Sequence, residues 1–365
     1  MRALTLAAGL ASLIIAGCAS KPTPLIPFAT DTPPLVLAPT SLAGGSDGRG
    51  RFREIFCQVL EARRQEVPDY RPCDEALTRL PNEDPPTGRA VALGRSASPL
   101  QVMIVPGVGW SCFEEFLDVK GTVVDHLARF GHEMSLLSVD ALSSSAHNAR
   151  MIRDAIMAMP APRNKRIVLV GYSKGAPDIL EAVATYPELQ DRVAAVVSAA
   201  GAVGGSPLVY DASQDTLDKL QYFPGSKCEV GDRGAVESLK PSVRQQWLAR
   251  YPLPRSIRYY SVVALPQPDR ISSVLRSSYD QLAQIDPRND SQVIFYDAVI
   301  PGSTILGYLN ADHWAVGVPL ARSHPFIASV LVDKNDYPRE ALMEAVARYI
   351  EEDLAAPRVA RSPSR

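Results

Sequence analysis

The chain lacks a concentrated run of basic residues, and its 38 lysines and arginines are nearly balanced by 40 aspartates and glutamates. Nucleic acid is therefore not an expected partner. Cysteine is also scarce, with five in 365 residues, and neither a Cys-x-x-Cys spacing nor closely paired histidines occur. Because zinc sites built from these residues need such spacings, we expect no metal site. The chemistry considered below requires no cofactor.

The first 18 residues are typical of an export signal. Arg2 is followed by an apolar run through residue 15, which is too short to span a membrane. The run closes on Ile15-Ala-Gly-Cys18, which resembles the lipobox of bacterial lipoproteins, whose cysteine is acylated after cleavage. This resemblance implies a signal peptide over residues 1–17 and a lipid anchor on Cys18. The alternative is a cleaved secretion signal with an incidental cysteine. Since no aspartate follows Cys18, we expect an anchor in the outer membrane, facing the periplasm.

Composition divides the rest of the chain. Residues 18–50 are rich in proline, threonine, serine and glycine, which predicts a flexible tether behind the cysteine. Residues 51–98 contain an early helix and are predicted to pack on the body as an N-terminal helical extension. Residues 99–356 form a main domain large enough for a single core, and residues 357–365 are predicted to be a disordered tail.

Four cysteines remain after Cys18, and an even number in an exported protein predicts two disulfides. Four cysteines permit three pairings. The most local arrangement joins Cys57 to Cys73 and Cys112 to Cys228, but the sequence does not choose among the three.

From residue 101 onward, short apolar runs alternate with helical patterns, which is typical of an α/β domain with a mostly parallel sheet. Strands are predicted at residues 101–105, 134–139, 166–170, 193–198, 257–264 and 303–309, and helices at residues 114–130, 146–159, 174–186 and 339–354. Residues 199–256 form a long insertion, which we interpret as a cap over the catalytic edge of the sheet. Its aromatic residues Trp247, Tyr222 and Phe223 either face the substrate or form the cap's own core.

A glycine-flanked serine stands where one predicted strand meets a helix. Residues 167–170 are apolar, residues 176–186 carry apolar side chains at helical spacing, and Gly171-Tyr-Ser-Lys-Gly175 joins them. Glycines beside the serine allow a tight turn on which its Oγ stands clear. An ordinary Gly-Ser turn is the alternative. The strand and the helix together favour Ser173 as a nucleophile.

A serine nucleophile needs a base, and histidine is the usual one. After such an elbow the acid comes next in the chain, and the histidine then stands on a loop behind the last strand. His313 follows the predicted strand 303–309 directly and is the preferred base, with His324 as the alternative; the other histidines, His126, His132 and His147, precede Ser173.

The acid should lie before His313. Candidates by position are Asp269, Asp280, Asp286, Asp290 and Asp297. Asp290 is preferred because a turn can present its carboxylate, and Asp297 is the alternative; Asp312 is interpreted as the cap of a turn. The oxyanion is expected to accept hydrogen bonds from the backbone N–H groups of Lys174, directly after the nucleophile, and of Val108, in a glycine-rich turn after the first strand. The alternative is that the glycines near Val108 serve only a tight turn.

Together these residues resemble the α/β-hydrolase superfamily over roughly residues 99–356. Asn289-Asp-Ser-Gln-Val293 is similar to the Asn-Asp-Gly-x-Val turn that bears the acid in bacterial lipases and esterases, with Ser291 where glycine is usual. The first loop has Pro106-Gly107 in place of that family's His-Gly pair. The resemblance implies an α/β-hydrolase fold and an envelope serine hydrolase that cleaves an ester or related acyl bond of a small or lipid-like substrate. The alternative is a non-catalytic lipoprotein of the same fold that binds an envelope ligand or partner.

Overall fold

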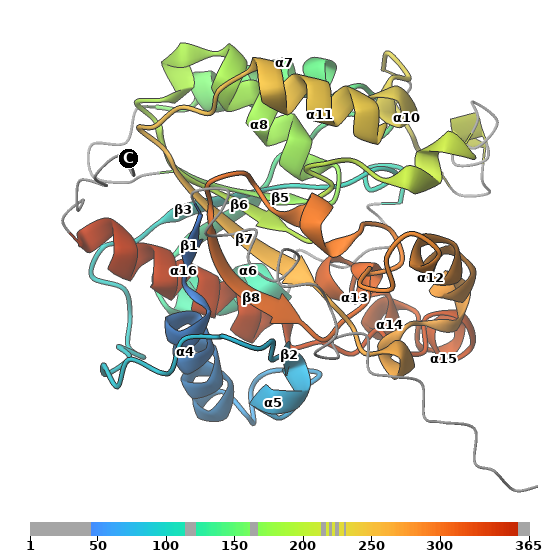
Figure 1. Cartoon of the computed structure of the whole chain (residues 1–365). Coiled ribbons are helices and arrows are strands. Elements are labelled where there is room, and N and C mark those ends of the chain that lie inside the picture. Colours follow the sequence, from blue (N-terminus) through green and yellow to red (C-terminus); the bar gives the residue numbers. More distant parts are fainter. Residues whose placement is uncertain are drawn as a thin grey trace, which may run out of the picture.

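A mostly parallel sheet runs through the centre of the molecule (Figure 1). The computed structural model describes residues 45–113, 122–160, 167–212, 217–218, 221–222, 226–229 and 231–356. Its strands are β1 (Ser46–Asp47), β2 (Leu77–Thr78), β3 (Gln101–Val105), β4 (Glu133–Leu136), β5 (Ile167–Tyr172), β6 (Val193–Ala199), β7 (Arg258–Ala264) and β8 (Thr304–Leu309). They lie in the order β1-β8-β7-β6-β5-β3-β4, and β2 pairs with β8 as the antiparallel member.

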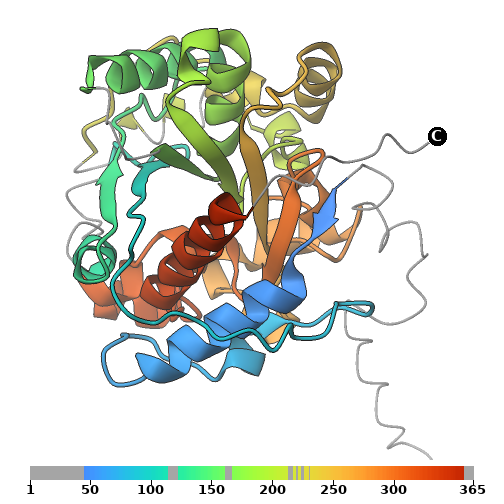
Figure 2. The ribbon, with the colours of Figure 1, turned by 90° about the vertical axis from the view of Figure 1, so that its left-hand side faces the viewer.

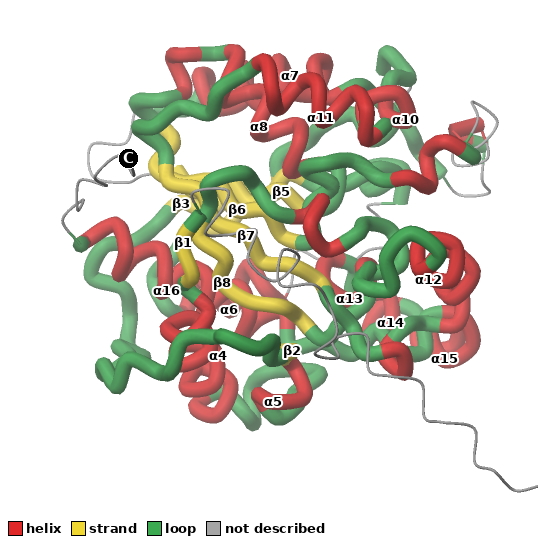
Figure 3. The backbone as a smooth tube through the Cα atoms, viewed as in Figure 1, coloured by secondary structure: helices red, strands yellow, loops and turns green. Residues whose placement is uncertain are grey.

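Two helical layers cover the faces of the sheet, as Figures 2 and 3 show from two directions. One layer holds α7 (Ser145–Ala158), α8 (Gly175–Thr185) and α11 (Pro241–Arg250), and the other holds α4 (Arg49–Ala62), α6 (Thr122–Arg129) and α16 (Arg339–Ala355). The side chains of β5 alternate between them: Ile167 and Leu169 join the core with α7 and α8, whereas Val168 and Val170 join the core with α4 and α16. A strand buried on both faces explains the continuous apolar run of β5.

Short helices gather near the carboxyl ends of β7 and β8 (Figure 1). They are α12 (Arg276–Ala283), α13 (His313–Gly317), α14 (Leu320–Ser323) and α15 (Pro325–Leu331), while α5 (Cys73–Ala76) and α10 (Ala235–Ser238) lie elsewhere. The single-turn 3-10 helices are η2 (Pro187–Leu189), η3 (Pro207–Tyr210), η4 (Pro268–Arg270), η5 (Ser273–Leu275) and η6 (Phe295–Ala298). None of the helices in the described ranges is long and apolar enough to cross a membrane.

The predicted α/β fold is confirmed, and each of the six predicted strands lies within three residues of an observed one. The helices predicted at residues 146–159, 174–186 and 339–354 correspond to α7, α8 and α16 within one residue at each end. Of the helix predicted at residues 114–130, the structure has α6, while residues 114–121 lie outside the described ranges.

The N-terminal region departs from the prediction. The tether was expected to continue to Gly50, but Ser46 and Asp47 already pair with β8, and α4 begins at Arg49. The region after it is not a purely helical extension, because β2 also pairs with β8. Strands of two residues carry no readable periodicity, which is why the sequence did not reveal them. Residues 18–44 and 357–365, the rest of the predicted tether and the tail, lie outside the described residues.

The insertion at residues 199–256 partly belongs to a helical layer. Arg244 of α11 donates to Glu181 of α8 at 2.7 Å, and Trp247 packs against the core around α7 and α8. Trp247 is therefore not a substrate-facing residue, because its ring packs within the outer helical layer of the domain. Tyr222 is 75% exposed, and Phe223 lies outside the described residues.

Both disulfides of the most local pairing are present. Cys57–Cys73 joins α4 to α5, and Cys112–Cys228 joins the loop after β3 to the insertion. The second bridge therefore ties the insertion to the end of the sheet where β3 and β5 terminate.

Candidate active site

Ser173 occupies a sharp turn between β5 and α8. Its φ of +54° lies in the left-handed region that non-glycine residues rarely adopt. A Cβ on Gly175 would come within 1.9 Å of the Val105 carbonyl oxygen, and one on Gly171 within 2.4 Å of the Ala176 Cα. Both glycines are thus required for the helix to pack this closely against the strands, as the elbow pattern predicts.

Ser173, His313 and Asp290 form a hydrogen-bonded line. Ser173 Oγ lies 2.9 Å from His313 Nε2, and His313 Nδ1 lies 2.7 Å from Asp290 Oδ2. An ionised Asp290 fixes the neutral imidazole with its proton on Nδ1, so Nε2 can accept the serine proton. Such a line can activate a hydroxyl as a nucleophile.

A tight turn holds the Asp290 carboxylate. Oδ1 accepts from the amides of Gln292 and Val293 at 2.9 and 2.7 Å, which leaves Oδ2 for His313. Ser291 within this turn has φ of +80°, the conformation that glycine adopts most easily. The turn therefore keeps the shape of the Asn-Asp-Gly-x-Val pattern although serine replaces the glycine.

Three further contacts position His313, the first residue of α13. The His313 amide donates to the Asp290 carbonyl at 2.9 Å, and the Tyr172 hydroxyl donates to the His313 carbonyl at 2.8 Å. Burial, with Asp290 and Asp312 nearby, raises the pKa of Tyr172 well above its ordinary value, so the hydroxyl remains a donor. Asp312 caps α13 by accepting from the Ala315 amide at 2.8 Å, as the sequence suggested.

The alternative acid and base have other surroundings. The Asp297 carboxylate packs against Gly204, where a Cβ would meet Oδ1 at 2.2 Å, and burial raises the pKa of Asp297 to about 7. His324 ends α14, with Nδ1 at 3.0 Å from Ser323 Oγ. The structure therefore brings His313 to Ser173 and Asp290 to His313. Among the described residues, no cluster of histidine, cysteine, aspartate or glutamate is arranged to hold a metal ion.

The Lys174 side chain forms an ion pair that the sequence reading missed. Its Nζ lies 2.7 and 2.8 Å from the two Asp178 oxygens, and Asn148 Nδ2 donates to the same carboxylate at 2.7 Å. Both members of the pair are about 1% exposed. Their i, i+4 spacing in the helix was the available signal.

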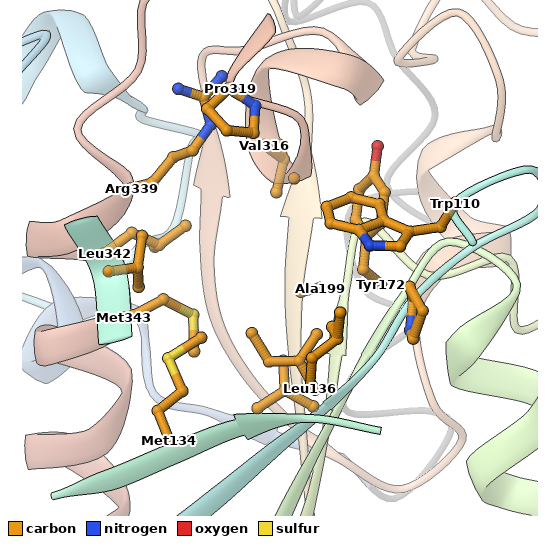
Figure 4. A pocket seen from close by; sticks show the side chains of 15 residues that line it. Trp110, Met134, Leu136, Tyr172, Ala199, Val316, Pro319, Arg339, Leu342 and Met343 are labelled. Carbon is orange, nitrogen blue, oxygen red and sulfur yellow. The ribbon is translucent and has the colours of Figure 1, made fainter. Parts of the chain in front are cut away.

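An apolar cavity of about 60 Å³ lies against the elbow (Figure 4). Tyr172, which precedes Ser173, forms one wall together with Trp110, whose ring meets it edge-on at 6.1 Å. Residues of α16 form the opposite side in the figure, among them Arg339 and Met343. Val316, which belongs to the same helix as His313, also lines the cavity. The cavity therefore adjoins both the strand that leads into Ser173 and the helix that carries His313.

Two solved structures are similar to this chain. A metagenomic carboxyl esterase is 42% identical, with a TM-score of 0.81, over 88% of this chain and 98% of that one. The mature form of a Bacillus licheniformis lipase is 18% identical, with a TM-score of 0.51, over 66% of this chain and 95% of that one, a likeness of fold alone. No model of a protein family matches the chain, and neither does any curated protein.

Proposed function

The chain belongs to the α/β-hydrolase superfamily and is an ester-hydrolysing enzyme, and from this premise we propose that Ser173, His313 and Asp290 are its catalytic triad. The observation that carries the proposal is the unbroken line of two hydrogen bonds from Ser173 Oγ to Asp290 Oδ2. The order of the three residues in the chain also agrees with the elbow fold.

In this mechanism Ser173 Oγ attacks the ester carbonyl carbon while its proton passes to His313 Nε2. Asp290 stabilises the imidazolium and keeps its orientation. The tetrahedral oxyanion accepts hydrogen bonds from the amides of Lys174 and Val108. When the carbonyl re-forms, the C–O bond to the alcohol breaks, and the alcohol leaves with the proton from His313. Water, activated by the same histidine, then hydrolyses the acyl-serine ester and releases the acid.

The acyl group of the substrate occupies the cavity beside Tyr172. Most of its lining side chains are apolar, among them Met134, Leu136 and Leu342, and burial of methylene groups there favours binding by about 0.8 kcal/mol each. A hydrocarbon acyl chain therefore fits the chemistry of the walls better than a sugar or a charged group.

The enzyme acts at a membrane, held by a lipid on Cys18 in the outer membrane and facing the periplasm. The apolar run that ends in Ile15-Ala-Gly-Cys18 supports this part of the proposal. A Cys18→Ala variant should lose incorporation of labelled palmitate in a bacterial host, and equal labelling of both proteins would contradict the anchor.

Replacement of the nucleophile tests the chemistry. Ser173→Ala should abolish the hydrolysis of 4-nitrophenyl esters and labelling by a fluorophosphonate, while the circular dichroism spectrum stays unchanged. Asp290→Asn should lower kcat by about 10⁴-fold because the wrong imidazole tautomer is stabilised. Asp297→Asn is the matched control and should keep kcat within about threefold of wild type. A folded Ser173→Ala enzyme with normal turnover, or an Asp297→Asn loss as large as that of Asp290→Asn, would overturn the triad.

A further inference from the structure

The cavity beside Tyr172 contains two buried hydrogen-bond donors without a partner. Trp110 and Arg339 both line it and are 7% and 4% exposed. Neither Trp110 Nε1 nor Arg339 Nε has a hydrogen-bond partner in the part of the chain that the structure describes. In Figure 4 the two side chains stand on opposite sides of the cavity, and the indole nitrogen is turned toward its interior. An apolar cavity with unused donors is chemically unlike a plain hydrocarbon pocket.

Both side chains are held in place by other contacts, so the donors cannot easily turn away. The terminal Nη2 of Arg339 donates to the carbonyls of Val318 and Asn335 at 3.0 and 2.8 Å, which fixes the plane of the guanidinium. The Trp110 ring packs edge-on against Tyr172, whose own hydroxyl is engaged by the His313 carbonyl. Tyr172 therefore does not compete for a ligand in the cavity.

The charge around Arg339 is already balanced. Its Nη1 lies 3.5 Å from Asp69 Oδ2, and Arg322 bridges Asp69 and Glu340. Two cations thus face two anions, so a carboxylate in the cavity would be an uncompensated charge among apolar side chains, which is costly. A neutral oxygen, which accepts a hydrogen bond without adding charge, suits these donors better.

We propose that this cavity selects acyl groups whose chain carries a neutral oxygen acceptor, such as a keto or hydroxyl oxygen, which accepts from Trp110 Nε1 or Arg339 Nε. The inference rests on the proposed function, because the acyl group reaches the cavity from Ser173. The loop before Trp110 touches the nucleophile, since a Cβ on Gly107 would lie 2.7 Å from Ser173 Cβ. A plain hydrocarbon chain would leave these buried N–H groups without an acceptor. The cost of the unpaired N–H groups makes the site discriminate strongly against such a chain.

The test compares matched esters. For 4-nitrophenyl esters with straight acyl chains of five to nine carbons, each unsubstituted ester is paired with analogues that have a keto group in place of one methylene beyond the third carbon. The measured quantity is the keto-to-methylene ratio of kcat/KM, divided by the same ratio for alkaline hydrolysis, which removes intrinsic reactivity. Wild type should give a ratio of at least about tenfold at the best keto position.

Two variants assign that preference to the donors. Trp110→Phe removes the indole N–H, and Arg339→Lys removes Nε while it retains the charge that faces Asp69. At least one of them should reduce the ratio by about threefold or more, whereas Trp247→Phe, the same exchange at a tryptophan outside the cavity, should leave it unchanged. The ratio is used because it does not depend on how much active enzyme each preparation contains.

The outcomes separate the two proposals. Ratios near one at every keto position in wild type, or a preference that survives both variants, would overturn the inference while Ser173-dependent hydrolysis remained. Failure of every ester to react, or hydrolysis that persists in Ser173→Ala, would instead overturn the proposed function.

Discussion

The buried ion pair behind the nucleophile gives a sharp prediction about stability. Lys174 and Asp178 are about 1% exposed, and Lys174 Nζ contacts both carboxylate oxygens at 2.7 and 2.8 Å. Asp178→Leu removes the anion and leaves a buried ammonium without its partner. Loss of one member of such a pair costs about 3–5 kcal/mol of the free energy of unfolding.

The double replacement Lys174→Met with Asp178→Leu should cost less than either single change. It removes both charges together, and what remains is the lost bond from Asn148 Nδ2, which donates to Asp178 at 2.7 Å. A buried donor left unsatisfied costs about 1–3 kcal/mol. The two substitutions are therefore expected to be strongly non-additive, with a favourable coupling between the apolar replacements.

Urea denaturation followed by circular dichroism measures these free energies. A surface pair provides the matched control: Lys240 and Glu237 lie 2.6 Å apart, but their side chains are 33% and 65% exposed. Glu237→Leu should cost less than about 1 kcal/mol. The reasoning is refuted if Asp178→Leu costs no more than Glu237→Leu, or if the double variant costs the sum of its two singles.

Two more predictions concern pH and the disulfides. Burial raises the pKa of Asp297 from 3.8 to about 7, so the folded protein holds this proton more tightly than the unfolded chain. The stabilising contribution of the bound proton is full below about pH 3.8 and is lost as the pH rises through 7. Asp297→Asn should therefore have a larger free energy of unfolding than wild type at pH 8, and urea titrations should show this difference shrinking toward pH 4. A difference that does not depend on pH would contradict this. Cys112–Cys228 spans 116 positions and Cys57–Cys73 spans 16; from loop closure, replacing the first pair by serines should cost about 5 kcal/mol and the second about 3 kcal/mol, and the reverse order in denaturation would disprove the role of loop length.

The local parts of the site were predictable because their signals are local. The elbow at Ser173 needs two glycines within five residues, and His313 follows its strand directly. The choice between Asp290 and Asp297 remained open in the sequence, since both precede the last strand. Only the approach of Asp290 Oδ2 to His313 Nδ1 at 2.7 Å distinguishes them.

Features built by distant parts of the chain were not readable. The cavity joins Trp110, after β3, to Arg339 in the last helix, and no pattern in the sequence relates these two positions. Trp247 was expected either to face the substrate or to join the cap's own core, but tertiary packing of α11 on α8 places it in the outer helical layer instead. Amphipathic spacing indicates that one face of a helix is buried, but it does not indicate which other elements of the fold cover that face.

The two short strands on β8 have a consequence for behaviour at high concentration. An edge strand with free N–H and C=O groups can recruit a strand of another molecule and start aggregation. The strands β1 and β2 pair with backbone groups along β8 and so cover that side of the sheet. The strand at the opposite edge, β4, is only four residues long and has exposed polar side chains at Glu133 and Ser135. The sheet therefore offers little template for a strand of another molecule at either edge.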